Sequence, residues 1–180
     1  MLTFALLLSV LPADAAVPGT GDLVFTEIMG APSCQYNEWV EVHNPTAEPM
    51  DLGGCVLSLL NPTSGSAAEH TIAGNPSVDP GAFAVLYRSS GSCGDVTCVD
   101  GDCAVPVLYE YGSLQFSNTD QRDVSLRCDG VEVDQVAVDL DAFRCNDGVF
   151  GSCTIQLDPA NLTAAANDDA TAEGVWCPPS

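Results

Sequence analysis

The sequence has no lysine and only four arginines, against 25 aspartates and glutamates. The resulting net charge of -21 repels phosphate backbones and anionic lipid head groups, so nucleic acids and membrane surfaces are not expected partners. Charged residues make up only 16% of the chain and hydrophobic residues 46%, so the acidity does not come from a disordered acidic tail. A chain of 180 residues with this composition is expected to fold as one domain.

The motifs that mark common active sites are also missing. The sequence has no Gly-x-Ser-x-Gly, no His-Glu-x-x-His and no phosphate-binding glycine loop. His43 and His70 are the only histidines, and neither has the sequence context of a Ser-His-Asp triad. An enzyme would need a pocket that holds one of them beside two carboxylates. We therefore expect a protein that is not an enzyme.

The first 16 residues have the pattern of a secretory signal peptide. An apolar run of about ten residues is followed by Pro12 and by Ala13-Asp14-Ala15-Ala16, although the basic residue expected before the run is absent. The run is shorter than the ~20 residues that a membrane span needs, and no later segment is long and apolar enough. We expect cleavage after Ala15 or Ala16 of a signal peptide at 1–16, no membrane span, and a secreted extracellular or cell-surface domain at 17–180.

Nine cysteines in a chain of this length support export, since such density is typical of compartments where thiols oxidise. Zinc binding is the alternative, but the sequence has no Cys-x-x-Cys pair and no His-x(3–5)-His spacing. An odd count leaves one thiol free or intermolecular, and the sequence does not fix the pairing. The disulfide candidates are Cys34, Cys55, Cys93, Cys98, Cys103, Cys128, Cys145, Cys153 and Cys177.

Short segments rich in β-branched and aromatic residues, each ended by Gly, Pro, Asn or Asp, predict an all-β sandwich or barrel. Asp129-Gly130 between two alternating segments is the strongest hairpin signal. Residues 89–104 have little apolar content and three cysteines, which indicates a Cys-rich surface insertion. An Ala-rich patch at 160–173 has a weak helical pattern. The predicted strands are 22–29, 38–44, 55–60, 69–72, 82–88, 123–128, 131–138 and 153–158.

Four segments follow one another within about residues 22 to 177: LVFTEIMGAPS, NEWVEVHNPTAEPMDLGGCVLS, VDPGAFAVLY and LQFSNTDQRDVSLRCDGVEVDQVAV. In this order they resemble the lamin-tail domain, which in bacteria occurs in secreted and surface proteins. Cys55, where an aromatic often follows the glycine, and the Cys-rich insertion depart from the pattern. The residues that fit the fold motif are Glu27, Glu38, Trp39, Glu41, Asn44, Gly54 and Asn118.

The resemblance implies a disulfide-stabilised, immunoglobulin-like antiparallel β-sandwich of the lamin-tail type. It also implies a non-catalytic structural or interaction module that binds an unknown extracellular protein or surface component. The alternative is an accessory or substrate-binding domain beside an extracellular hydrolase such as a nuclease or phosphatase, because the fold is also found appended to such enzymes.

The segment EWVEVHNP, residues 38 to 45, holds the densest group of candidate metal or acid-base residues. On a strand, Glu41 and His43 share a face with Trp39, whereas Glu38 points to the other face, so at most two of the three ligands converge. We therefore interpret the segment as a fold element. Glu41 and His43 are expected to bond neighbouring strands or loop amides, and Asn44-Pro45 to end the strand. Glu27, in the first strand, can face Glu41 or a loop.

Two acidic loops remain, at 94–103 and 167–169. Asp95, Asp100 and Asp102 offer hard oxygen ligands among glycines, as Ca²⁺ sites do, but the glutamate at the twelfth position of an EF-hand loop is missing. We therefore expect a solvated acidic loop and no bound metal or cofactor, with calcium binding at this loop as the alternative.

Overall fold

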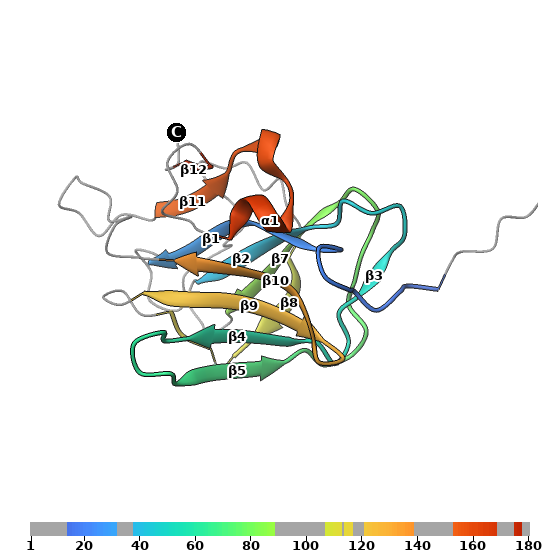
Figure 1. Ribbon diagram of the computed structural model, residues 1–180. Coiled ribbons are helices and arrows are strands. Elements are labelled where there is room, and N and C mark those ends of the chain that lie inside the picture. The colour runs from blue at the N-terminus through green and yellow to red at the C-terminus, as the bar shows by residue number, and fades with distance from the viewer. Residues whose placement is uncertain are drawn as a thin grey trace, which may run out of the picture.

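The fold is built from two facing β-sheets, and Figure 1 shows them as two layers in a computed structural model. The model describes residues 14–31, 38–88, 107–112, 114–116, 121–138, 153–168 and 175–177. One sheet has six strands in the order β12-β11-β1-β2-β7-β8, and the other has four in the order β10-β9-β4-β5. A two-stranded sheet, β3-β6, lies beside them. The expected all-β, immunoglobulin-like sandwich is confirmed.

The elements have the following bounds: β1 Val24–Ala31, β2 Trp39–His43, β3 Met50–Asp51, β4 Val56–Leu60, β5 Ala67–Thr71, β6 Ser77–Val78, β7 Phe83–Arg88, β8 Val107–Tyr111, β9 Arg122–Cys128, β10 Val131–Val138, β11 Cys153–Leu157 and β12 Trp176–Cys177, with a 3-10 turn at Pro159–Asn161 and one helical turn, α1, at Ala164–Asn167. All eight predicted strands are present, and their ends differ from the predicted ones by at most two residues. The Ala-rich patch forms only the single turn of α1. None of the helices in the described part of the chain could cross a membrane.

Strand β8 was not predicted, and its pairing departs from the antiparallel pattern expected throughout. It lies parallel to β7, with Leu86 opposite Tyr109 and Arg88 opposite Tyr111. A parallel neighbour requires a long connection rather than a tight turn. The chain between Arg88 and Val107 is long enough for that connection, which is why these adjacent strands need not form a hairpin.

The main core lies between the two large sheets and follows the alternation of the strands. Val40 and Val42 of β2 are at most 1% exposed and belong to the same cluster as Leu57 of β4 and Leu126 of β9. Trp39 is also buried, but it lies in a separate cluster with Met29 and Val85. Because strand residues alternate between faces, this smaller cluster is on the outer face of the six-stranded sheet.

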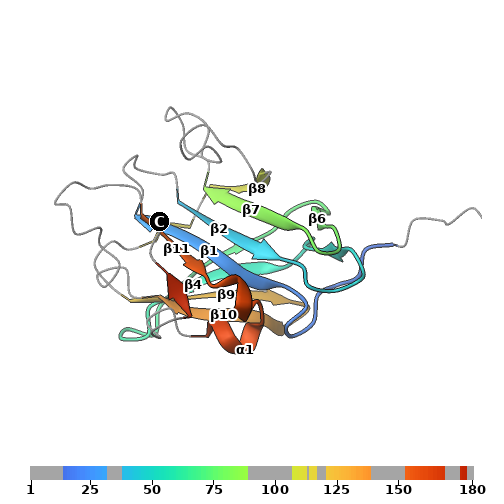
Figure 2. The same ribbon diagram turned by 90° about the horizontal axis from the view of Figure 1, so that it is seen from above.

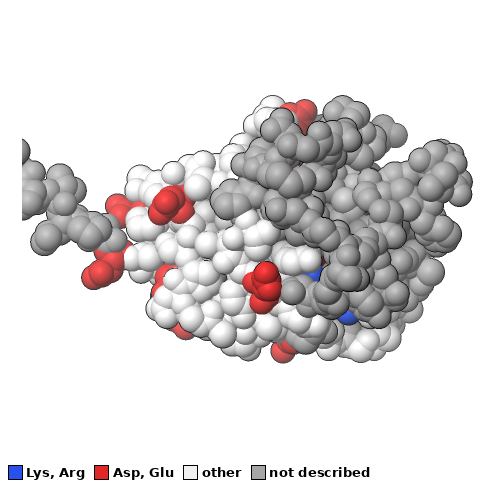
Figure 3. Space-filling view, turned by 180° about the vertical axis from the view of Figure 1, so that it is seen from behind, with Lys and Arg blue, Asp and Glu red and all other residues white. Residues whose placement is uncertain are grey.

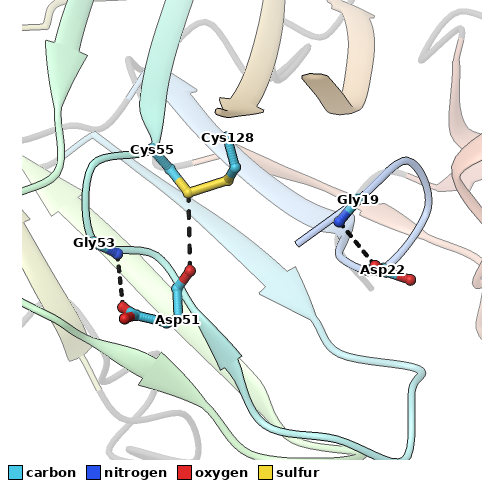
Figure 4. Close-up of a disulfide and its surroundings, with 6 residues drawn as sticks. All are labelled: Gly19, Asp22, Asp51, Gly53, Cys55 and Cys128. Atoms are coloured by element: carbon cyan, nitrogen blue, oxygen red, sulfur yellow. Dashed lines mark hydrogen bonds between the residues drawn. A yellow bond between two sulfur atoms is a disulfide. The ribbon is translucent and has the colours of Figure 1, made fainter. Parts of the chain in front are cut away.

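A disulfide joins Cys55, next to the start of β4, to Cys128 at the end of β9. Val56 pairs with Arg127 in the ladder, so the two cysteines lie directly across from each other, and both are buried in the main core (Figure 4). The bridge spans 73 positions of sequence, and closing such a loop stabilises the folded state by about 4 kcal/mol in the chain-entropy model. Two of the disulfide candidates are thus shown to be paired.

The hairpin predicted at Asp129-Gly130 is confirmed. Asp129 has φ 49° and Gly130 has φ 78°, the left-handed geometry that a two-residue turn between twisted antiparallel strands requires. This turn sets the register of β9 and β10, with Cys128 opposite Val131.

Candidate functional site

The candidate site is built on β2, which lies between β1 and β7 in the six-stranded sheet (Figure 1). Glu41 and His43 alternate with the core residues Val40 and Val42, so their side chains share the outer face of this sheet. Glu27 of β1 is directly opposite Glu41 in the ladder. The prediction that Glu27 could face Glu41 is therefore confirmed.

Glu41 is 7% exposed, and its Oε1 accepts a hydrogen bond of 2.7 Å from the Thr26 hydroxyl. Burial raises the pKa of Glu41 to about 7, although the Thr26 hydrogen bond opposes the shift, and the nearby Glu27 carboxylate raises it further. Burial also raises the pKa of Glu27, against hydrogen bonds from Thr154 and Gln156. Glu41 is thus able to take up a proton near neutral pH.

A carboxylate pair of this kind can serve acid-base chemistry only beside a substrate site or a further reactive group. His43 shares the face, but its Nδ1 lies 3.2 Å from the Ala82 carbonyl and donates to it, and its ring stacks on Phe83 with centroids 4.3 Å apart. Within the described ranges, no group of three or more His, Cys, Asp or Glu side chains is placed to hold a metal ion. The bonds of Glu41 and His43 to neighbouring strands and loop backbone agree with their interpretation as fold residues.

Glu38 lies on the opposite side of the sheet from Glu41, as the alternation predicted. It is 4% exposed and forms a buried ion pair of 2.8 Å with Arg88 of β7. Burial raises the pKa of Glu38, while Arg88 and a backbone hydrogen bond from Phe116 lower it. Burial, followed by the Glu38 charge, raises the pKa of Tyr111, whose hydroxyl has no hydrogen-bond partner in the described structure. The pair ties β2 to β7 and to residues 114–116.

Strand β2 ends before Asn44, as predicted from Asn44-Pro45, and the Asn44 side chain also organises the loop that follows. It is completely buried, and its Nδ2 donates to the carbonyls of Glu48 and Val78 at 2.8 and 2.9 Å. Its Oδ1 accepts from the backbone N–H and the hydroxyl of Thr46 at 2.9 and 2.7 Å. All four bonds of this amide therefore serve the fold.

The turn before β4 also depends on particular residues of the fold motif. Asp51 Oδ1 accepts from the Gly53 N–H at 2.8 Å (Figure 4). A Cβ at Gly53 would lie 2.4 Å from the Gly74 carbonyl oxygen, and Gly54 has φ 79°. Neither position accepts a side chain without strain, so Gly54 belongs to the fold as predicted.

A buried polar network around Asp134 was not predicted. Asp134 is 4% exposed, and its Oδ2 accepts from the Phe25 N–H and from Asn167 Nδ2, both at 2.7 Å. Asn167 Nδ2 also donates to the Phe25 carbonyl at 2.9 Å, and the backbone carbonyl of Asn167 accepts from Trp176 Nε1 at 3.1 Å. Burial raises the pKa of Asp134 to about 7, against its hydrogen bonds from Asn167, Phe25 and Gln135.

This network fastens α1 and β12 to β1 and β10 at the edge where the two sheets meet, and Figure 2 shows α1 at this edge beside β10. Asp134 shares a face of β10 with the core residues Val136 and Val138, and the ladder shifts register between Glu132 and Asp134. The irregularity buries Val133 and Asp134 together, and no local sequence signal reveals it.

His70, the second histidine, bridges the open edges of the two sheets. Its Nε2 lies 3.0 Å from the Tyr109 hydroxyl of β8, and the same hydroxyl accepts from the Ala73 N–H at 3.0 Å. Its ring centroid lies 6.0 Å from that of Tyr111. The contacts hold β5 and β8 together and, like those of His43, serve the fold.

The remaining predicted site residues lie outside the described structure. They are the calcium candidates Asp95, Asp100 and Asp102, the motif residue Asn118, and Cys34, Cys93, Cys98, Cys103 and Cys145, while Cys153 and Cys177 are described only as backbone in β11 and β12.

On the face that Figure 3 shows, the acidic side chains of the described residues lie apart from one another rather than in one patch. Three of the four arginines are described. Arg88 pairs with Glu38, Arg127 pairs with Glu69, and Arg122 donates to the Gln121 carbonyl at 2.9 Å.

Comparison with known proteins gives a family match that agrees with this architecture. The family model of the lamin tail domain matches residues 16–139, which is well over half of the chain. The match starts slightly upstream of the region of resemblance at about residues 22 to 177 and ends well before its C-terminal end. It contains β1 to β10. No curated protein matches the chain. Domains of this family are immunoglobulin-like modules that are not generally catalytic. The chain belongs to the lamin tail domain family.

Proposed function

We propose that this protein is a secreted, non-catalytic module that binds an extracellular protein or another component of the cell surface. The observation that supports the proposal is that the candidate catalytic and metal-binding side chains are bonded to neighbouring parts of the fold. Glu41 is bonded to Thr26, His43 is bonded to Ala82 and stacked on Phe83, and Glu38 is paired with a buried arginine. Side chains committed to neighbouring strands in this way hold a binding scaffold in shape, as expected for a module of this family.

Export is supported by the cysteines and by the N-terminal segment. The Cys55–Cys128 bridge is of a kind that persists in oxidising compartments. The Ala16 N–H donates to the Pro49 carbonyl, and the Asp51 N–H donates to the Ala16 carbonyl, each at 2.8 Å. A mature chain that starts at Ala16 keeps the contact with Asp51, and its new amino group can still donate to Pro49. Cleavage after Ala15 thus fits both the small-residue motif and the fold.

The test is binding of the purified secreted protein, fluorescently labelled, to intact cells of the organism that produces it. We expect saturable binding that unlabelled protein competes away. A variant with both Cys55 and Cys128 replaced by Ala, assayed above its melting temperature, serves as the unfolded control and should not bind. The proposal would be contradicted if the labelled protein bound specifically neither to these cells nor to other proteins that the organism secretes.

Catalysis is tested on the same preparation with phosphodiester, phosphomonoester, ester, glycoside and peptide substrates. We expect no turnover above buffer. Turnover that disappears in His43→Gln or His70→Gln, while a folded Glu48→Gln control retains it, would show an enzyme and overturn the non-catalytic assignment. Binding confined to one co-secreted hydrolase would instead favour the accessory-domain alternative.

A further inference from the structure

The four-stranded sheet has two edge strands, β10 and β5, and in the described structure only β10 has hydrogen-bond partners along its outward side. The outer edge of β10 is occupied. The Gly21 N–H donates to the Val133 carbonyl and the Ala137 N–H donates to the Asp168 carbonyl, while the Thr20 hydroxyl donates to the Glu132 carbonyl. At the other edge, no described segment pairs with the outward side of β5, which Figure 1 shows as the lowest strand.

The register of the β4–β5 hairpin identifies the backbone groups that point outward. The Asn61 N–H donates to the Ser66 carbonyl at one end of the ladder, and the Ile72 N–H donates to the Cys55 carbonyl at the other. Antiparallel ladders alternate between bonded and non-bonded pairs, so Ala68 and His70 bond to β4. The backbone N–H and C=O groups of Ala67, Glu69 and Thr71 are directed away from β4, and the side chains of all three are exposed.

Proteins usually protect an exposed edge with proline, lysine, a bulge or a covering segment. Strand β5 has the sequence AAEHT and pairs with β4 without a register shift, so it has none of the first three. Its only charged side chain is Glu69, which forms an ion pair with Arg127 of β9. Small side chains at Ala67, Ala68 and Thr71 leave the backbone accessible to another strand.

The charges around β5 select the kind of strand that can be added. Among the described strand residues, the outer face of this sheet carries Glu69, Asp123 and Glu132 against one basic residue, Arg127, because these residues share a face in the ladders of β5, β4, β9 and β10. Two-fold pairing of β5 with a second copy would place Glu69 opposite Glu69, between molecules of net charge -21 each. The opposite face of the edge presents Ala68 and the Tyr109 ring, which suit apolar side chains.

We propose that β5 is the docking edge for an extended segment of a partner protein in which basic and apolar side chains alternate. The segment adds as a fifth strand to the sheet. Its backbone bonds to Ala67, Glu69 and Thr71, its basic side chains lie beside Glu69, and its apolar side chains lie beside Ala68. This inference rests on the proposed function as a binding module and names the surface that binds.

The test compares Thr71→Pro with Thr71→Ala in the full-length protein. Proline removes the outward N–H at position 71 without removing a hydrogen bond to β4, and edge strands accept proline at such positions. Alanine keeps the N–H and serves as the matched control. The probe is a short, end-blocked, fluorescent peptide of alternating Lys and Val, measured by anisotropy at physiological salt. A peptide of alternating Glu and Val serves as the charge control.

We expect the wild type and Thr71→Ala to bind the Lys-Val peptide equally and Thr71→Pro to bind it at least about tenfold more weakly, a loss comparable to that of one or two hydrogen bonds. The Glu-Val peptide should not bind. Amide hydrogen exchange should slow at Glu69 and Thr71 when the peptide is present. If Thr71→Pro fails to fold, Ala67→Pro removes the equivalent outward N–H at the other end of β5.

Equal binding of the proline and alanine variants would overturn the inference, because it would show attraction to the acidic surface in general. The inference would also be overturned if the wild type were a dimer and the Thr71→Pro variant a monomer, since a second copy of the chain would then occupy the edge. If Thr71→Pro still binds producer cells like the wild type, the β5 inference fails and the proposed function stands. If the wild type binds no cells or secreted proteins, the proposed function fails whatever the peptide does.

Discussion

Replacing Glu41 by Gln should make the protein more stable above pH 7 and change its stability little near pH 4. Burial beside Glu27 raises the pKa of Glu41 from 4.5 to about 7 in the folded state. Between those two pH values the folded protein binds a proton that the unfolded chain releases. The free energy of unfolding therefore falls as pH rises through this window, and the loss is complete above about pH 7.

The size of the effect on the free energy of unfolding follows from the pKa shift of Glu41. A pKa raised from 4.5 to about 7 corresponds to about 3 kcal/mol, since one pH unit is worth about 1.4 kcal/mol. Partial solvation of the carboxylate makes this an upper bound. Glutamine cannot ionise, and its carbonyl oxygen can still accept from the Thr26 hydroxyl, so the variant avoids this loss. Asp134, whose pKa is also raised to about 7 by burial, leaves a shallower slope in the same direction.

The assay is urea unfolding from pH 5 to pH 8.5, followed by tryptophan fluorescence. The wild type should lose stability as pH rises, and the curve of Glu41→Gln should cross above it and be about 2 to 3 kcal/mol higher at pH 8. Glu48→Gln changes an exposed carboxylate and should follow the wild type within about 0.5 kcal/mol. Parallel curves for the wild type and Glu41→Gln would refute the account of a buried, proton-binding Glu41.

Three further outcomes are expected. Replacing both Cys55 and Cys128 by Ala should lower the free energy of unfolding by about 4 kcal/mol, and a loss below about 1 kcal/mol would contradict the role of the bridge. Trp39→Ala should cost about 3 kcal/mol by urea unfolding, because the ring is 7% exposed. An unchanged midpoint would show that the outer cluster contributes nothing. Intact-mass analysis of secreted protein should give a chain starting at Ala16, and retention of Met1 would contradict processing.

The strands could be predicted because their signals are local. Alternation in residues 38–44 placed Val40 and Val42 in the core, and Asp129-Gly130 fixed a hairpin by its backbone geometry. The prediction that Glu38 lies apart from Glu41 needed only the two-residue period of a strand. These inferences held because the alternation of faces is the same whatever the strand's neighbours.

The missed features depend on contacts between distant residues. Strand β8 was missed because it pairs in parallel with β7, and no tight turn between the two strands marks such a pairing in the sequence. The partner of Glu38 could have been sought among four arginines, but only the fold brings Arg88 to it. The register shift before Asp134 and the hydrogen bond from Asn167 to its carboxylate were also missed, because only the folded chain brings these residues together. Long-range pairing and bulges of this kind have no signature in one sequence.

The claim at the centre of this account is that the polar residues of EWVEVHNP hold the sandwich together. It is tested most directly by the free energy of unfolding of Asn44→Ala. The completely buried amide makes four hydrogen bonds, to Glu48, Val78 and Thr46, and some of these groups can reach water once it is removed. We predict a loss of about 2 to 4 kcal/mol. A loss below about 0.5 kcal/mol, with binding to producer cells abolished in the still-folded variant, would show instead that the segment is a ligand site.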